Sequence, residues 1–272
     1  MLNFWQLSIS CVGRRALFAL ALALITAGVA FAVLRLGPSA ERPASTSTTI
    51  VHARLEAPLR QKLALGTSVR GRRINAFALG DPDTAQPLVV VGAIHGDEPA
   101  GISIARDLAA DPPPRSGLIL TIPDLNPDGV AAGTRQNARG VDLNRNFPWR
   151  WRRLERLGGP EYSGPRPLSE PESRLARSLI LRTRPRITVW FHQPLSVVDE
   201  SGGSRRIERT FARLIQLPLH RLTRYAGSAA SWQDHRLPGT TAFVVELPPG
   251  KPSPGLVERG SDGIRTLLRR FD

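Results

Sequence analysis

Residues 88–99, LVVVGAIHGDEP, join a buried strand to a group of chemically active side chains. The run from Leu88 to Ala93 is short, continuous and apolar, which is typical of a strand buried on both faces of a sheet. Pro99 then suits the first turn of a helix, because the N–H that proline lacks would have no helical partner there. A buried strand that turns directly into a helix indicates an α/β domain.

The same alternation of strand and helix continues along the chain. Further buried strands are predicted at residues 117–122, 187–191 and 241–247. Helices are predicted at residues 99–109, 170–181, 205–215 and 255–270. We therefore expect the α/β class: a single domain with a central mixed, mostly parallel sheet that helices cover on both faces.

The composition narrows the class of protein. The chain has 272 residues and a formal net charge of +14, from 37 Lys and Arg against 23 Asp and Glu. Such a charge fits a nucleic-acid binder, a membrane-surface protein or an enzyme with anionic substrates. The arginines are scattered and no nucleic-acid motif accompanies them, so we expect no nucleic-acid partner. Cys11 is the only cysteine, which excludes a disulfide scaffold and a cysteine-based zinc module.

An uncharged apolar segment lies near the start of the chain, at residues 16–34. About 20 apolar residues span a bilayer core, and the cations Arg14 and Arg15 before the segment favour the cytoplasmic side. Residues 1–36 are therefore predicted to be a membrane anchor (a signal anchor), with a cleaved signal peptide as the alternative. Residues 37–50, rich in Pro, Ser and Thr, are predicted to be a linker. The expected localisation is membrane-anchored with the domain at residues 51–272 extracytoplasmic, or secreted if the segment is cleaved.

Potential metal ligands follow two of the predicted strands. His95 and Glu98 come directly after the first, at the edge where α/β sheets place their ligand sites. His192 follows residues 187–191 in the same way. Zinc in catalytic sites takes three nitrogen or oxygen ligands from the protein and keeps a fourth position for water. These three residues are therefore candidate zinc ligands, although His-x-x-Glu taken alone fits an ordinary surface loop equally well.

Residues 126–147 contain many side chains whose hydrogen-bond donors have a fixed geometry. Arg135, Asn144 and Arg145 are candidates to clamp a carboxylate or a developing oxyanion, which a guanidinium does with two parallel hydrogen bonds. Asp142 is a candidate to orient a ligating imidazole through the imidazole's second nitrogen.

Glu246 stands inside the apolar sequence FVVELPPG. Burying a carboxylate among valines, leucine and phenylalanine is costly unless the group is paired or functional. Glu246 is therefore a candidate catalytic group, with a salt bridge to one of the many arginines as the alternative.

Several strings of the sequence together resemble the zinc carboxypeptidase family, and within it the murein peptide amidase branch. The resemblance covers residues 65–250. It rests on LGTSVRGRRI (65–74), GAIHGDEPAG (92–101), NPDG (126–129), GVDLNRNFP (140–148), YSGPRPLSEPES (162–173), WFHQP (190–194) and PGTTAFVVELPPG (238–250). Each string alone is modestly specific, but their joint occurrence in this order is highly specific. The fold that the resemblance implies is zinc carboxypeptidase-like.

The resemblance also implies roles for the metal-site residues. One Zn²⁺ per domain is expected on His95, Glu98 and His192, with Asp142 supporting the first histidine. Glu246 matches the catalytic glutamate, which takes a proton from water and then delivers it to the leaving amine.

The remaining site residues match groups that bind the substrate. Asn144 and Arg145 match the pair that grips the terminal carboxylate. Arg135 matches the arginine that polarises the scissile carbonyl, with the nearby Arg139 as the alternative. A peptide or muropeptide with a free carboxylate is therefore the expected partner.

The chain departs from the digestive carboxypeptidases in two ways. No tyrosine stands in the stretch before the catalytic strand, where residues 231–235 read SWQDH instead, and the region between His192 and Glu246 is short. Both features resemble the murein amidase branch, which cleaves between γ-D-glutamate and meso-diaminopimelate. A zinc metallopeptidase acting on peptidoglycan-derived peptides is therefore expected. The alternatives are a general metallocarboxypeptidase that releases C-terminal residues and a non-catalytic protein that binds cell-wall peptides.

Overall fold

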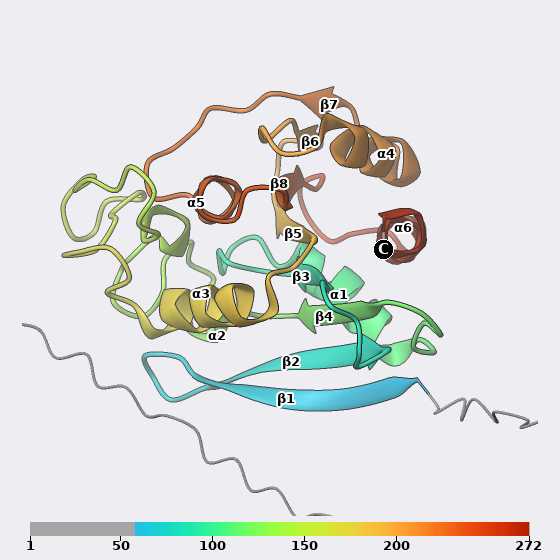
Figure 1. Ribbon diagram of the computed structural model, residues 1–272. Helices are drawn as coiled ribbons and strands as arrows, with labels where there is room; N and C mark the ends of the chain where they lie inside the picture. Colours follow the sequence, from blue (N-terminus) through green and yellow to red (C-terminus); the bar gives the residue numbers. More distant parts are fainter. Residues whose placement is uncertain (1–57, 272) are drawn as a thin grey trace, which may run out of the picture. The chain divides into compact units, whose positions relative to one another are not determined.

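The computed structural model describes residues 58–271, which belong to one compact unit (Figure 1). Eight strands form one sheet in the order β1-β2-β4-β3-β5-β8-β6-β7. The strands are β1 Leu59–Thr67, β2 Arg73–Gly80, β3 Leu88–Val91, β4 Leu118–Ile122, β5 Ile187–His192, β6 Val197–Asp199, β7 Leu219–His220 and β8 Thr241–Glu246. The central strands β4, β3, β5 and β8 run parallel to one another. The pairs β1–β2, β2–β4 and β6–β8 are antiparallel, and the edge pair β6–β7 is parallel. The predicted mixed α/β sheet is confirmed.

Helices cover both faces of the sheet (Figure 1). They are α1 Ala100–Ala110, α2 Pro127–Ala132, α3 Pro171–Thr183, α4 Arg205–Ile215, α5 Ala229–Arg236 and α6 Pro254–Phe271, with a 3₁₀ turn η1 at Leu143–Arg145. The helices α1, α4 and α6 pack on one face, and α3 and α5 pack on the other. The four predicted helices correspond to α1, α3, α4 and α6.

The central strands are buried on both faces because successive side chains point in opposite directions. In β3, Val90 packs into the core beneath α1, α4 and α6, whereas Val89 and Val91 pack into the core on the other side. Because both faces of these strands are buried, their sequences are continuous apolar runs, and these runs predicted the central strands. The hairpin β1–β2 was missed, since β1 lies at the edge of the sheet and exposes many of its side chains.

Gly96 fixes the turn that leads from β3 into α1. A Cβ atom on this residue would lie 1.9 Å from the carbonyl carbon of Gly129 in α2, so no other residue fits there without moving the backbone. This close approach holds the turn with His95 and Glu98 against α2.

The predicted localisation is corrected by the structure. Among residues 58–271, no helix combines the length and the apolar composition that crossing a bilayer requires. This finding contradicts the predicted membrane anchor and the predicted membrane partner. Residues 16–34, on which that prediction rested, and the predicted linker at residues 37–50 lie outside the described residues.

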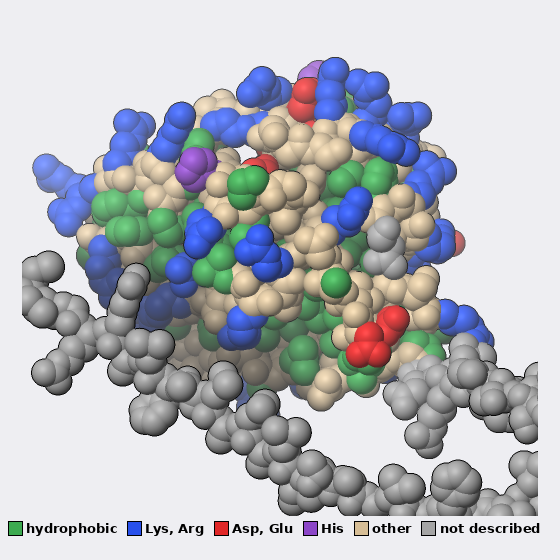
Figure 2. Space-filling model, viewed as in Figure 1, with side chains coloured by type: hydrophobic (Ala, Val, Ile, Leu, Met, Phe, Trp, Pro, Cys, Tyr) green, Lys and Arg blue, Asp and Glu red, His purple; other side chains and the backbone are tan. Residues whose placement is uncertain are grey.

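Cationic side chains cover much of the surface. Figure 2 shows lysines and arginines spread over the visible face and its rim, with few acidic side chains among them. Much of the chain's positive charge is therefore carried by solvated side chains, away from the core.

Candidate metal centre

Three side chains converge at the carboxyl ends of two neighbouring parallel strands. His95 and Glu98 lie in the turn between β3 and α1, and His192 is the last residue of β5. Because Val91 of β3 pairs with Trp190 of β5, the two strand ends lie side by side. One ligand atom from each of the three residues lies within 4.8 Å of the others, and all three residues are buried. The structure thus brings together the three residues that the sequence predicted as zinc ligands.

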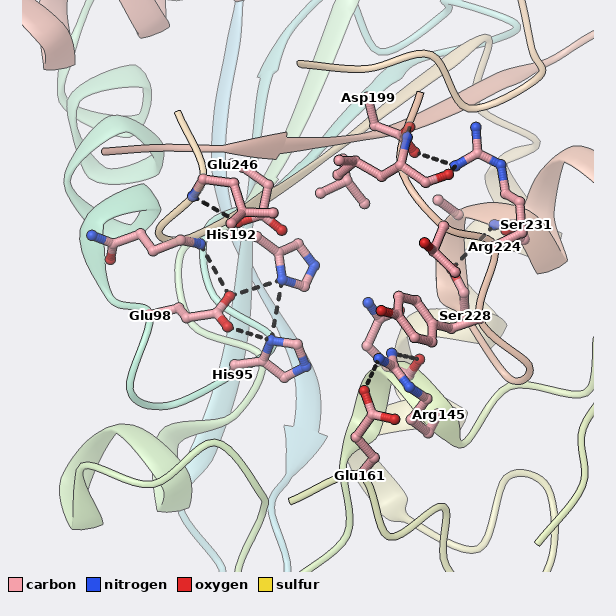
Figure 3. Close-up of a pocket in the computed structure, with 18 of the residues that line it drawn as sticks. His95, Glu98, Arg145, Glu161, His192, Asp199, Arg224, Ser228, Ser231 and Glu246 are labelled. Carbon is pink, nitrogen blue, oxygen red and sulfur yellow. Dashed lines mark hydrogen bonds and ion pairs between the residues drawn. The ribbon is translucent and has the colours of Figure 1, made fainter. Parts of the chain in front are cut away.

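The distances among these atoms fit a metal ion. Nδ1 of His192 lies 2.8 Å from Oε2 of Glu98, and Nδ1 of His95 lies 3.0 Å from Oε1 (Figure 3). The two Nδ1 atoms lie 3.1 Å apart. Two imidazole nitrogens and a carboxylate that face one another are the donor set of many catalytic zinc sites. Burial would raise the pKa of Glu98, but His192 and His95 hold it well below its usual range.

Asp142 orients the first histidine. Its Oδ1 lies 3.0 Å from Nε2 of His95 and also accepts from the backbone N–H of Asn144. The carboxylate favours the proton on Nε2, which leaves the Nδ1 lone pair free for a metal. Burial alone would raise the pKa of Asp142, but His95 and Arg135 hold it well below its usual range. This carboxylate is therefore charged at neutral pH.

Arg135, and not Arg139, lies beside the metal ligands. Its Nη1 donates to Glu98 Oε1 at 2.8 Å and its Nε to Asp142 Oδ2 at 3.0 Å. Arg139 instead has a side chain that is 56% exposed, and it lies 3.6 Å from Glu170, away from the pocket. The geometry thus separates the two arginines that the sequence left as alternatives.

Glu246 ends β8, directly beside His192 in the parallel ladder. Within the described part of the chain it forms no ion pair with an arginine, so the salt bridge that the sequence left open is not found there. Burial raises its pKa, His192 partly offsets this, and the charge of Glu98 adds to the rise. A carboxylate with a raised pKa binds a proton more readily, which suits it to proton transfer beside a metal site.

Asn144 and Arg145 line a pocket of about 360 Å³ that the metal ligands and Glu246 also line. Figure 3 shows Arg145 across this pocket from the metal ligands. Arg145 Nη2 donates to Glu161 at 2.7 Å, and the ring of Tyr225 lies 4.1 Å from the guanidinium carbon. Its Nε is buried and has no hydrogen-bond partner among the described residues. The amide of Asn144 is held by the N–H of Ala229 at the start of α5.

The pocket contains further charged residues that sequence reasoning missed. Arg224 pairs with Asp199 at 2.6 Å, and Glu161 pairs with Arg145 (Figure 3). These residues lie at loop or strand-end positions, so no periodic signal identified them. Two other aromatic side chains take no part in the pocket: Trp232 packs in the core and His235 is exposed.

Comparisons with known proteins agree with this geometry. The zinc carboxypeptidase model matches residues 115–198. Murein peptide amidase A of Vibrio campbellii is 34% identical over 202 residues, which cover 68% of this chain and 78% of that protein. The murein-tripeptide amidase MpaA of Escherichia coli O157 has a crystal structure that matches with a TM-score of 0.65 and 28% identity, covering 81% of this chain and 97% of that chain.

A more distant relative is the gamma-D-glutamyl-L-diamino acid endopeptidase 1 of Lysinibacillus sphaericus. It is 30% identical over 190 residues, which cover 53% of this chain and 46% of that protein. At the identity and coverage of the amidases, the chain belongs to the zinc carboxypeptidase family, in its murein peptide amidase branch, and is a zinc metallopeptidase.

Proposed function

We propose that this protein hydrolyses an amide bond in peptidoglycan-derived peptides, the bond between γ-D-glutamate and meso-diaminopimelate. The observation that carries the proposal is a single pocket lined by the three metal ligands, by Glu246 and by Arg145. The names of the relatives support the substrate class, since they are murein peptide amidases and a γ-D-glutamyl-diamino acid endopeptidase.

His95, Glu98 and His192 are the residues that would hold the zinc ion, with Asp142 fixing the imidazole of the first. When bound, Zn²⁺ supplies Lewis-acid chemistry: it polarises a carbonyl and lowers the pKa of water. Glu246 takes one proton from the attacking water as the new carbon–oxygen bond forms at the scissile carbonyl. It then delivers this proton to the amine nitrogen, and the carbon–nitrogen bond breaks. The raised pKa of Glu246 suits both transfers.

The arginines of the pocket bind the substrate in this proposal. Arg145 and Asn144, which line the pocket, hold the carboxylate of the leaving residue. Arg135 uses Nη1 and Nε for Glu98 and Asp142, so its Nη2 remains to stabilise the oxyanion that develops on the scissile carbonyl.

A general metallocarboxypeptidase is the second candidate, because a carboxylate-binding arginine opposite a zinc site also serves release of C-terminal residues. The two activities differ in the bond that they cleave. A γ-linked D-glutamyl peptide is the substrate of the first, and an ordinary α-linked peptide is the substrate of the second.

The test is hydrolysis of L-Ala-γ-D-Glu-meso-diaminopimelate by the purified zinc-loaded protein, followed by mass spectrometry beside α-linked tripeptides. Release of diaminopimelate is expected from the γ-linked peptide only, and it should stop after treatment with a chelator and return with zinc. Glu246→Ala should abolish release, whereas Glu258→Ala, an exposed carboxylate on α6, should not. Preference for α-linked peptides would favour the carboxypeptidase, and binding without cleavage would favour a non-catalytic protein.

A further inference from the structure

We propose that Asp199 and Arg224 form the subsite that recognises the far end of the leaving residue, where one carbon carries both an ammonium and a carboxylate. This inference rests on the proposed function and deepens it. In this proposal, one ion pair makes the protein prefer a diamino dicarboxylic acid to a residue with a simpler side chain.

The ion pair lies in the same pocket as the metal ligands. Asp199 ends β6, and Arg224 stands in the loop between β7 and α5. Nη1 of Arg224 lies 2.6 Å from Oδ2 of Asp199. In Figure 3 this pair appears at one end of the side opposite the metal ligands and the pair Arg145–Glu161 at the other end, with Ser228 and Ser231 between them.

Arg224 retains hydrogen-bond donors for a ligand. Its Nη1 donates to Asp199 and to the carbonyl of Leu222, and its Nη2 donates to the carbonyl of Glu200. A guanidinium has five N–H donors, so Nε and one N–H of Nη2 have no acceptor among the described residues. The side chain is 21% exposed, which leaves it accessible from the pocket. These two donors suit a second carboxylate.

Asp199 supplies the matching negative charge. Its side chain is only 5% exposed, and its oxygens accept from the N–H of Leu222 at 2.9 Å and from Arg224. An ionised carboxylate has about four acceptor positions, so capacity remains for an ammonium. Glu161 provides a second negative charge at the other end of the pocket, where it pairs with Arg145.

Apolar side chains complete the lining of this pocket, among them Leu222, Ala230 and Val244. Val244 stands two residues before Glu246 on β8, so both side chains lie on the same face of the sheet. Together with Arg145 and the pair Asp199–Arg224, these residues offer a cation, an apolar surface and a second ion pair. Diaminopimelate presents the complementary groups: one carboxylate, three methylenes and a zwitterionic end.

The test compares four tripeptides, L-Ala-γ-D-Glu-X, on the zinc-loaded protein. X is meso-diaminopimelate, L-lysine (no distal carboxylate), L-2-aminopimelate (no distal ammonium) or L-norleucine (neither). We expect kcat/KM for the diaminopimelate peptide to exceed that for the lysine peptide by roughly 10- to 100-fold, the usual effect of hydrogen bonds to a charged group. Norleucine should be the poorest substrate, because it leaves the ion pair unmatched.

Variants then assign the preference to each residue. Arg224→Gln should remove most of the preference for diaminopimelate over lysine, and Asp199→Asn should remove most of the preference for diaminopimelate over 2-aminopimelate. Arg221→Gln is the matched control, since Arg221 is exposed in the same loop but does not line this pocket. Circular dichroism checks that each variant is folded.

The outcomes separate this inference from the proposed function. If the unmodified protein cleaves all four tripeptides at similar rates, or if Arg224→Gln lowers all four rates alike, the inference is wrong and the proposed function stands. If a variant does not fold, the comparison of substrates on the unmodified protein decides. If none of the γ-linked tripeptides is cleaved, the proposed function fails and the inference falls with it.

Discussion

The pocket has two sides, and their side chains are held in place by different means. The metal side consists of His95, Glu98, His192 and Glu246, which lie at or just beyond the carboxyl ends of β3, β5 and β8. The binding side consists of Arg145, Glu161, Asp199 and Arg224. Its two ion pairs join residues 16 and 25 positions apart in the sequence.

This difference separates chemistry from specificity. The parallel ladder between β5 and β8 places His192 and Glu246, where small displacements of a catalytic group are costly. Asp142 and Arg135 support His95 and Glu98 in the turn after β3. Side-chain ion pairs hold the binding side, so we expect substitutions there to alter what is bound. Changes to the metal side should therefore affect metal content and turnover, and changes to the binding side should affect KM and substrate choice.

His192→Ala should have the largest effect, because it removes a ligand donor from the metal side. We expect zinc content to fall from one ion per chain toward zero. Removing a residue that only hydrogen-bonds to a metal ligand lowers activity by up to roughly 100-fold, and removing the ligand itself should lower it by more. Zinc analysis and kcat/KM on the diaminopimelate tripeptide measure both effects. The control is His220→Ala, an exposed histidine on β7; a variant at His192 that keeps full zinc and activity would refute the ligand assignment.

Arg145→Gln should weaken the binding side alone. Loss of a hydrogen bond between charged partners lowers kcat/KM by roughly 10- to 100-fold, and we expect most of the loss in KM. Zinc content should stay unchanged. Steady-state kinetics with zinc analysis measure this, with Arg139→Gln outside the pocket as the control. A fall in zinc content, with KM unaltered, would mean that the two sides are not independent.

Asp142→Asn tests whether the contact between Asp142 and His95 strengthens zinc binding. The neutral amide no longer favours the Nε2 proton of His95, so zinc affinity should fall by roughly 10- to 100-fold. Competition with a chelator measures the affinity, and Asp262→Asn, exposed on α6, serves as the control. Unchanged affinity would show that the backbone alone positions His95.

Asp234→Asn should have the smallest effect, on stability near the binding side. Asp234 accepts from the N–H of Ala242 and contacts Ser201, and burial raises its pKa to about 7. Because the folded state favours the protonated acid, its contribution is full below the unfolded pKa near 3.8 and is lost as the pH rises through 7. The stability of the unmodified protein should therefore decline more steeply between pH 4 and 8 than that of the variant. Urea denaturation at several pH values measures this, and parallel curves would contradict it.

The sequence predicted the metal side almost completely and the binding side only in part. Buried parallel strands have continuous apolar runs, so the ends of these strands can be located in the sequence. His95 and His192 follow two such ends, which identified them as potential ligands of one metal ion. Asn144 and Arg145 were identified through the string GVDLNRNFP. Glu161 and Arg224 were missed, because loop residues follow no period and their partners are far apart in the sequence.

Elsewhere the sequence was less informative about the fold. The edge hairpin β1–β2 was missed because its exposed side chains obscure the apolar pattern of a strand. The predicted membrane localisation was wrong on the finding for residues 58–271. That prediction relied on the hydropathy of one segment and the charges beside it, whereas the site prediction combined residue type, spacing and position at strand ends.

Cleavage of the γ-D-glutamyl bond should depend on one zinc ion held by His95, Glu98 and His192. The most direct test is a titration of the metal-free protein with zinc while release of diaminopimelate from the tripeptide is measured. We expect the rate to rise in proportion to bound zinc and to level off at one ion per chain. Cleavage by the metal-free protein, or no cleavage by protein that holds one zinc ion at this site, would contradict it.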